Sequence, residues 1–201
     1  MSQSKEQTLL ARQPIYKSDG SVFGYELLFR SNKDLSAIEV GDDQATSEVL
    51  VNYCTSVSGE MANKHKPIFI NVSESFIHSE AFLPIDKNLV VIELLERITV
   101  DKKLINAVKA WKKFGFRFAL DDFDFSEQWK EIIPYIDFIK IDVLNYDSDW
   151  IKQQKQTLPY KNITWLAEKI EDQEVLSQYQ EQGFELFQGY FLAKPKTILG
   201  N

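Results

Sequence analysis

The segment Phe116-Arg117-Phe118-Ala119-Leu120-Asp121-Asp122-Phe123 gives the strongest indication of fold in this chain. Its apolar residues Phe116, Phe118 and Leu120 predict a buried strand, which ends in two adjacent carboxylates. Two neighbouring acids repel each other unless a cation or a basic partner lies between them. A lone Asp-Asp pair is ordinary at a solvated turn, so the meaning of Asp121 and Asp122 depends on how the other strands end.

Strands and helices alternate along the chain on both sides of this segment. A helix capped by Asp101 precedes it and ends at Gly115, and a helix of about two turns is predicted to follow it and to end before Pro134. Other helices are predicted at 45–57, 73–82, 150–156 and 172–182, and other strands at 68–72, 89–93, 137–142, 163–168 and 186–188. These strands are continuously apolar, which indicates a parallel sheet covered on both faces.

An antiparallel hairpin is predicted to open the domain. Residues 8–16 and 21–30 have strand patterns, and Ser18-Asp19-Gly20 forms a tight turn between them. The hairpin brings the total to about eight strands, which favours a TIM-like β/α barrel. The length of 201 residues is short for that fold, so some helices should be shortened or missing. An open doubly wound sheet is the alternative, but no glycine-rich phosphate loop follows the first strand.

Composition limits the functional classes. The length predicts a single domain, 1–201, and the net charge of −7 argues against a broad basic surface for long nucleic acids. The single cysteine, Cys54, excludes an internal disulfide and a zinc site built on several thiolates, and two histidines argue against a His-rich metal site. The polar N-terminus and the lack of a long apolar stretch predict a cytoplasmic protein without a membrane segment.

Polar side chains recur where the predicted strands end. The set comprises Asn71, Glu93, Asp121, Asp122, Lys140, Asp142, Glu168 and Gln188. In a β/α barrel the carboxyl ends of the strands meet on one face, where active sites are built. Converging carboxylates need cations, and carboxylate and amide oxygens suit Mg²⁺, Mn²⁺ or Ca²⁺. Each residue alone is ordinary at a solvated strand end, but together they predict a metal site.

The same residues carry a family resemblance over nearly the whole chain. In order, the motifs are Tyr25-Glu26-Leu27-Leu28-Phe29-Arg30, Asn71-Val72-Ser73, Glu93-Leu94-Leu95-Glu96, Asp121-Asp122-Phe123, Lys140-Ile141-Asp142, Ala167-Glu168-Lys169-Ile170-Glu171, and Gln188-Gly189-Tyr190 with Pro195. This series resembles the EAL domain, the cyclic di-GMP phosphodiesterase family of bacteria. The resemblance implies an EAL-type barrel that hydrolyses cyclic di-GMP to pGpG in second-messenger signalling.

The resemblance also implies a metal site that uses Mg²⁺ or Mn²⁺. Glu26, Asn71, Glu93 and Asp121 would bind one ion, and Asp121 with Asp122 would help to hold a second. The residue pattern alone leaves Glu26 as a solvent-facing strand residue, so its role comes only from the resemblance.

Further roles follow from the same resemblance. Lys140 would orient the attacking water or stabilise negative charge, although an ion pair with neighbouring acids is the plain alternative and both can hold. Glu168 would act as a base or metal partner, and Gln188 would position water or phosphate. Glu96 would steady the loop after the Asp pair, and Arg30 would bind a ligand phosphate or a guanine edge.

The chain departs from the family pattern after the Asp pair. The family continues with Gly-Thr-Gly, a loop linked to metal binding and dimerisation, whereas this chain has Asp124-Phe125-Ser126. A loop without glycine is not expected to take positive φ angles, so its shape should differ. A receptor that binds cyclic di-GMP without cutting it and a protein-interaction domain therefore stay open beside the enzyme. A homodimer is a further expectation, and the trimmed length resembles a branch often followed by an HDOD domain, which would lie beyond Asn201.

Overall fold

The strands of this protein form a closed barrel. The computed structural model describes residues 9–30, 66–78, 86–159 and 162–198. In this part of the chain one sheet has the order β2-β3-β4-β5-β6-β7-β8-β1-β9. Strand β1 (Leu9–Lys17) pairs antiparallel with both β2 (Val22–Arg30) and β8 (Leu186–Phe187), and this double pairing closes the ring formed by β1 to β8. The predicted antiparallel hairpin is confirmed.

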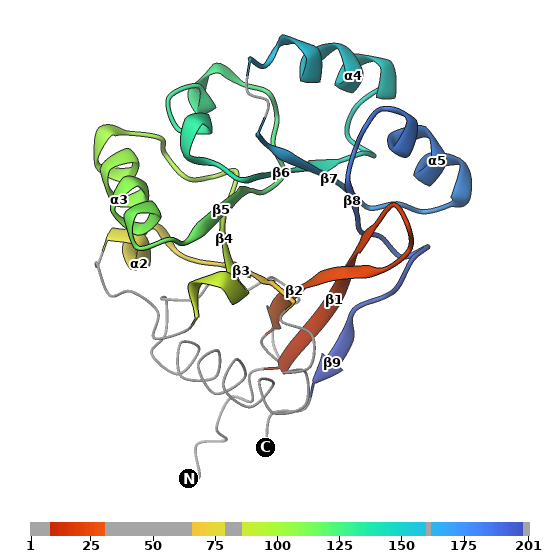
Figure 1. Ribbon diagram of the computed structural model, residues 1–201, viewed down its shortest axis with the longest axis horizontal. Helices are drawn as coiled ribbons and strands as arrows, with labels where there is room; N and C mark the ends of the chain where they lie inside the picture. The colour runs from red at the N-terminus through yellow and green to blue at the C-terminus, as the bar shows by residue number, and fades with distance from the viewer. Residues whose placement is uncertain (1–8, 31–65, 79–85, 160–161, 199–201) are drawn as a thin grey trace, which may run out of the picture.

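The other strands of the ring run parallel to β2, as predicted. They are β3 (Ile68–Asn71), β4 (Val90–Leu94), β5 (Arg117–Leu120), β6 (Phe138–Asp142) and β7 (Thr164–Glu168). Figure 1 looks into the ring of strands, with helices α3, α4 and α5 outside it. The structure therefore confirms the β/α barrel. Strand β9 (Lys196–Ile198), which was not predicted, pairs antiparallel with the first half of β1.

The α-helices of the described ranges are α2 (Glu74–His78), α3 (Lys102–Lys113), α4 (Ser148–Thr157) and α5 (Gln173–Glu181). Aspartate side chains cap the N-termini of three of the helices: Asp101 for α3, Asp147 for α4 and Asp172 for α5. The Asp101 carboxylate accepts a hydrogen bond from the Leu104 backbone N–H at 2.7 Å and thereby starts α3. The helix buries Leu104, Val108 and Trp111 against the barrel and stops before Gly115, whose φ is +94°.

The helix predicted between Asp122 and Pro134 is wrong. The structure has two short 3₁₀ helices there, η3 (Glu127–Trp129) and η4 (Ile133–Tyr135). Trp129, Ile132 and Ile133 are all buried, and the backbone bonds of this stretch join residues three apart, as in a 3₁₀ turn. Pro134 lies in the first turn of η4, where its missing N–H removes no helical hydrogen bond.

The barrel interior consists of an apolar layer and a polar layer. The apolar layer comprises Ile15, Phe69, Val91, Ala119, Phe138, Leu166 and Leu186. Because successive side chains on a strand alternate between its two faces, the residue two positions further along points into the same interior. On the parallel strands these residues are Asn71, Glu93, Asp121, Lys140, Glu168 and Gln188, and on β1, which runs the other way, the equivalent residue is Gln13. The period of two therefore brings the polar side chains together above the apolar layer.

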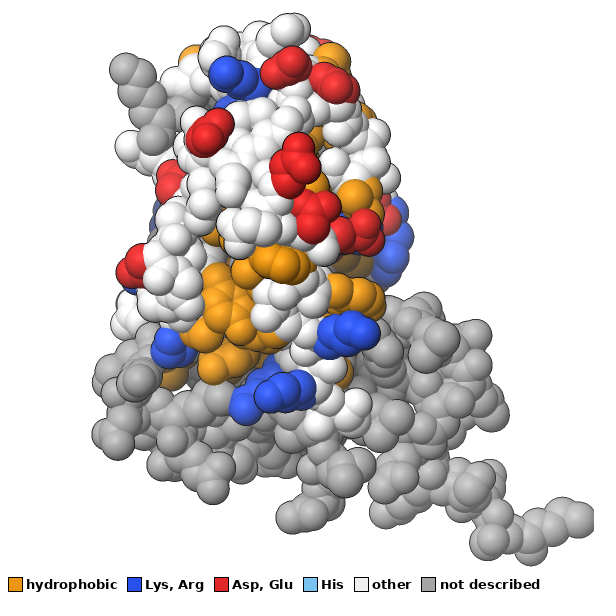
Figure 2. Space-filling view, turned by 90° about the vertical axis from the view of Figure 1, so that its right-hand side faces the viewer, with side chains coloured by type: hydrophobic (Ala, Val, Ile, Leu, Met, Phe, Trp, Pro, Cys, Tyr) orange, Lys and Arg blue, Asp and Glu red, His pale blue; other side chains and the backbone are white. Residues whose placement is uncertain are grey.

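One side of the barrel has an uneven distribution of charge. Figure 2 shows hydrophobic side chains gathered in the middle of this face, with acidic side chains mostly toward one end and scattered Lys and Arg side chains toward the other. Within the described ranges, no helix has the length and apolar character needed to cross a membrane. The helix predicted at 45–57, Cys54 and the side chain of Arg30 lie outside what the structure describes.

We predict that Gly24→Ala destabilises the barrel at the β2–β3 junction. A Cβ atom at Gly24 would lie 2.4 Å from the carbonyl oxygen of Pro67, which accepts a hydrogen bond from the Tyr25 N–H at 3.0 Å. The substitution should lower the free energy of unfolding by about 1–3 kcal/mol, as overpacking does, when measured by urea denaturation. Lys152→Ala on the exposed part of α4 should change it by less than about 0.5 kcal/mol. An unchanged midpoint for Gly24→Ala would contradict the close packing.

Candidate active site

A pocket opens at the carboxyl ends of the parallel strands, where the polar layer lies. Its volume is about 530 Å³, within the usual size of a ligand site. The acids that line it are Glu26, Glu96, Asp121, Asp122, Glu168 and Glu171. Of the strand-end residues that the sequence predicted to converge, five line this pocket: Asn71, Asp121, Asp122, Glu168 and Gln188.

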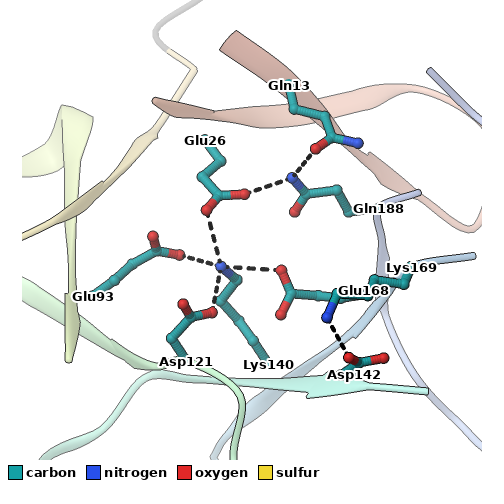
Figure 3. Close-up of polar contacts among 9 residues, drawn as sticks. All are labelled: Gln13, Glu26, Glu93, Asp121, Lys140, Asp142, Glu168, Lys169 and Gln188. Carbon is teal, nitrogen blue, oxygen red and sulfur yellow. Dashed lines mark hydrogen bonds and ion pairs between the residues drawn. The ribbon is translucent and has the colours of Figure 1, made fainter. Parts of the chain in front are cut away.

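A buried lysine lies at the centre of this polar layer. The Lys140 side chain is 1% exposed, and its Nζ lies 2.7 Å from Glu93 Oε1 and 2.7 Å from Asp121 Oδ1. The same atom lies 3.1 Å from Glu168 Oε1 and 3.4 Å from Glu26 Oε1 (Figure 3). The ion pair with neighbouring acids that the sequence left as an alternative for Lys140 is thus present, and it involves four strands other than its own.

The electrostatics of the cluster leave acid in excess. Burial by itself lowers the pKa of Lys140, but the four surrounding carboxylates raise it well above its usual value, so this side chain is an ammonium. Burial raises the pKa values of Glu93 and Glu168 well above the usual range, although Lys140 opposes this. One ammonium group cannot balance four carboxylates, so the cluster favours binding of protons or of another cation.

Two glutamine side chains hold Glu26 in place. The Nε2 group of Gln188 donates to Glu26 Oε2 at 2.6 Å and to Gln13 Oε1 at 3.1 Å (Figure 3). Gln13 Nε2 in turn donates to the Ala193 carbonyl at 3.1 Å. Gln13 was not among the predicted site residues. The only feature of the sequence that could have indicated it is its place two residues before the apolar Ile15 in a predicted strand, which puts both side chains on the same face. Because Gln13 contacts Gln188 and not a ligand, we regard it as a positioning residue.

Gly189 allows the segments after β7 and β8 to cross closely. A Cβ atom at this position would lie 2.1 Å from the oxygen and 2.2 Å from the nitrogen of Ile170. The Ile170 N–H also donates to the Gln188 carbonyl at 3.0 Å. Only glycine fits this approach, which fixes Gln188 beside the end of β7.

A second charged group lies beside the Lys140 cluster. Lys169 Nζ donates a hydrogen bond to Asp142, whose side chain is buried. Asp122 is half-buried with φ +43°, and its pKa is raised, first by burial and then by the neighbouring Asp121. Burial lowers the pKa of Lys169, but the hydrogen bond to Asp142 and the charges of nearby acids raise it above its usual value. Asp142 was among the strand-end residues, whereas Lys169 had no predicted role.

The loop after Asp121-Asp122 is held by aromatic packing. Phe125 has φ +59°, so the expectation that this glycine-free loop avoids positive φ is wrong. The Phe125 ring lies 5.3 Å from that of Trp150 and 6.2 Å from that of Trp165, stacked on the latter. Asp124 Oδ1 accepts hydrogen bonds from the Ser126 N–H at 3.0 Å and from the Trp129 indole at 2.7 Å. These contacts offset the unfavourable backbone angle.

The side chains around Lys140 have the donor chemistry of a divalent-metal site. Among the described residues, Asn71 Oδ1 and Glu93 Oε2 are buried acceptors without a hydrogen-bond donor, and Glu93 Oε1 contacts Lys140 without hydrogen-bond alignment. Carboxylate and amide oxygens fit Mg²⁺ or Mn²⁺. In this conformation no three His, Cys, Asp or Glu side chains of the described segments already form a metal-binding group. The four carboxylates contact Lys140 instead, so some of them would have to reorient to bind an ion.

Two predicted site residues lie at the edge of this arrangement. Glu96 is exposed on the segment after β4 and lines the pocket, and its predicted effect on the loop stays a prediction. Arg30 ends β2, and its predicted ligand contact likewise stays a prediction.

Fold and site together define a β/α-barrel protein with one antiparallel strand in the ring and an acidic pocket at the carboxyl ends of the others. The sequence matches the EAL domain over residues 2–195, so the chain belongs to the EAL domain family. It is 34% identical over 197 residues to the uncharacterised protein YuxH of Bacillus subtilis (strain 168), covering 96% of this chain and 48% of that protein. It is 31% identical over 194 residues to the cyclic di-GMP phosphodiesterase CdgJ of Vibrio cholerae, covering 95% and 45%.

Solved structures show the same fold. A complex of Klebsiella pneumoniae BlrP1 with calcium and cyclic di-GMP superposes with a TM-score of 0.73 at 22% identity, covering 98% of this chain and 58% of that chain. The manganese and cyclic di-GMP complex of BlrP1 gives a TM-score of 0.72 at 20% identity, with the same coverage. The chain spans about half the length of the curated relatives it matches.

We predict that Lys140→Met destabilises the metal-free protein, and more strongly at pH 8 than at pH 5. Losing the shared cation should lower the free energy of unfolding by about 3–5 kcal/mol at pH 8, as removing one partner of a buried ion pair does. The raised pKa values of Glu93 and Glu168 mean that these groups favour the folded state at low pH and lose that contribution as pH rises through their folded-state pKa. Without Lys140 the pKa values of Glu93 and Glu168 rise further, so both groups are protonated at pH 5. Neutral carboxyl groups need no cation to balance them, and the loss of stability is therefore smaller at pH 5.

Urea denaturation in EDTA at both pH values measures this difference. Lys112→Met is the matched control, because Lys112 forms a half-exposed ion pair with Asp137 at 2.7 Å. Its loss should be about 1 kcal/mol or less. An equal loss at pH 5 and pH 8 for Lys140→Met would show that the carboxylates do not take up protons when the lysine is removed.

Proposed function

We propose that this chain is a divalent-metal-dependent phosphodiesterase that hydrolyses cyclic di-GMP to pGpG in bacterial second-messenger signalling. The observation that supports this most directly is the convergence of Glu26, Glu93, Asp121 and Glu168 on Lys140, because three of these acids, Glu26, Asp121 and Glu168, also line the pocket. Membership of the EAL domain family and the phosphodiesterase name of the CdgJ relative support the same reaction.

The first ion would be held by Glu26, Asn71, Glu93 and Asp121. Asn71 Oδ1 and Glu93 Oε2, buried without donors among the described residues, are suited to this role. Asp122, next to Asp121, is the candidate for holding a second ion. Such an ion supplies a Lewis acid for the phosphoryl oxygens and lowers the pKa of a bound water. We propose Mg²⁺ or Mn²⁺, and the manganese in the BlrP1 complex supports this choice.

The protein's own groups supply the rest of the chemistry. Water adds to one phosphorus, the bond from that phosphorus to a ribose oxygen breaks, and the ring opens to linear pGpG. Glu168, which lines the pocket and lies 3.1 Å from the Lys140 ammonium, takes the proton of the attacking water. The Lys140 ammonium stabilises the negative charge that grows on the phosphoryl oxygens. The leaving ribose oxygen takes a proton from solvent.

Gln188 and the pocket rim position the ligand in this proposal. Gln188 Oε1 is a buried acceptor without a donor in the described part of the chain, and it accepts a hydrogen bond from the attacking water. The side chains of Leu144 and Tyr190 line the pocket and are 55% and 63% exposed, so they offer surfaces for a guanine base. Arg30 completes the proposed ligand contacts with a phosphate or a guanine edge.

A receptor that binds cyclic di-GMP without cutting it is the second candidate. The loop after the Asp pair favours it, because Asp124-Phe125-Ser126 stands where the family has Gly-Thr-Gly and Phe125 is packed between Trp150 and Trp165. A loop fixed in this way would resist the rearrangement that moves the carboxylates from Lys140 to a metal ion. The homodimer, the HDOD domain beyond Asn201 and the cytoplasmic location stay predictions.

We predict that the protein converts cyclic di-GMP to pGpG with Mn²⁺ or Mg²⁺ and that EDTA stops the reaction. Glu26→Gln should lower the rate by about a hundredfold or more, because the amide keeps the shape of the side chain but removes the charge of a metal ligand. Chromatography of the products measures the rate, and the urea midpoint checks that the variant is folded. Glu127→Gln, on an exposed side chain of η3, should leave the rate unchanged.

The outcomes separate the candidates. A full rate for Glu26→Gln would remove Glu26 from the catalytic site. Binding of cyclic di-GMP without pGpG would make the chain a receptor, and neither binding nor hydrolysis would leave a protein-interaction domain.

A further inference from the structure

Lys169 brings a second ammonium group to the acidic pocket. It directly follows Glu168 at the end of β7, and it lines the pocket together with Asp122. Its Nζ donates a hydrogen bond to Oδ2 of Asp142, whose side chain is 4% exposed (Figure 3). A buried carboxylate at the edge of the site is therefore already paired with a cation from the next strand.

The backbone at Lys169 is in a conformation that favours glycine. Its φ is +60°, in the left-handed region, where a side chain is unfavourable. Glycine would adopt this conformation without strain, whereas a lysine does so only where its surroundings hold it there. Strain of this kind persists where the surroundings fix the residue, and here the contact with Asp142 does so.

Lys140 and Lys169 form ion pairs with different acids. The ion-pair partners of Lys140 are the four carboxylates described above, and within the described residues they do not include Asp122 or Asp142. Lys169 contacts Asp142, and its charge opposes the rise in the pKa of Asp122. The acids beside Asp121 that could hold a second divalent ion are therefore close to a positive charge that the chain itself supplies.

We propose that Lys169 supplies the second positive charge of this site, in place of a second divalent ion beside Asp122 and Asp142. The chain then binds one divalent ion, at Glu26, Asn71, Glu93 and Asp121, and its two lysines provide the remaining charge for a phosphodiester. This inference rests on the first ion site of the proposed function and refines the number of ions. A lysine that only stabilises the fold through Asp142 is the alternative that the test must separate.

Counting bound Mn²⁺ on the metal-free protein, without nucleotide, tests the proposal. Equilibrium dialysis, in which electron paramagnetic resonance measures the concentration of free Mn²⁺, should give one bound Mn²⁺ per chain. Lys169→Gly and Lys169→Asn both remove the charge, and both new residues tolerate positive φ. Each variant should therefore bind a second Mn²⁺. This second ion should bind at least tenfold more tightly than any second ion on the unmodified chain. Lys169→Arg keeps the charge and should stay at one.

A matched control and the fold of the variants keep the count interpretable. Lys152→Asn removes the same charge from the exposed part of α4 and should stay at one Mn²⁺. Because glycine relieves the positive φ, Lys169→Gly should unfold in urea at no lower midpoint than the unmodified protein if the contact with Asp142 is not needed for stability. A much lower midpoint with an unchanged count would make Lys169 a structural residue and overturn the proposal.

The remaining outcomes distinguish this inference from the proposed function. Two Mn²⁺ on the unmodified chain, or one on both Lys169→Gly and Lys169→Asn, would overturn the inference and leave hydrolysis of cyclic di-GMP untouched. The expected change in count without any pGpG would overturn the hydrolase and support the inference. No bound Mn²⁺ on any of the proteins would contradict both.

Discussion

The buried ammonium group of Lys140 is the constraint on which the rest of the site depends. A charge taken out of water costs several kcal/mol unless opposite charges and hydrogen bonds compensate for it. Here the compensation comes from Glu26 on β2, Glu93 on β4, Asp121 after β5 and Glu168 on β7. Five strands of the ring are thereby joined at one end by a single atom, and the apolar layer beneath isolates that atom from the far end of the barrel.

This arrangement is a poor way to make a stable barrel. Well-packed apolar side chains in place of a buried ion cluster are often neutral or stabilising, and the cluster here has more carboxylates than ammonium groups. It also leaves acceptors on Asn71, Glu93 and Gln188 without donors in the described part of the chain. Departures of this kind concentrate at functional sites, because a site that must bind a cation or a phosphodiester cannot be satisfied beforehand by its own neighbours.

The polar layer could be predicted from the sequence wherever a parallel strand ends in a polar residue. Asn71 and Glu168, which end β3 and β7, follow this rule, because a side-chain period of two and a common strand direction bring them to one level. Glu26 lies within the pattern of β2, and only the family resemblance placed it in the site. Gln13 was missed because β1 runs the other way, so its polar residue comes before the apolar one rather than after it.

Backbone strain explains why the loops could not be foreseen. Asp122, Phe125 and Lys169 have φ values of +43°, +59° and +60°, and a sequence pattern reserves such angles for glycine. Two of them are held by contacts with residues distant in sequence: Phe125 packs against the rings of Trp150 and Trp165, and Lys169 pairs with Asp142. Glycine adopts positive φ readily because it has no Cβ atom, whereas these two residues adopt it because contacts of their side chains compensate for the strain. The loops after β5 and β7 are therefore fixed before any ligand arrives, which reduces the ordering cost of binding and limits how far the site can rearrange.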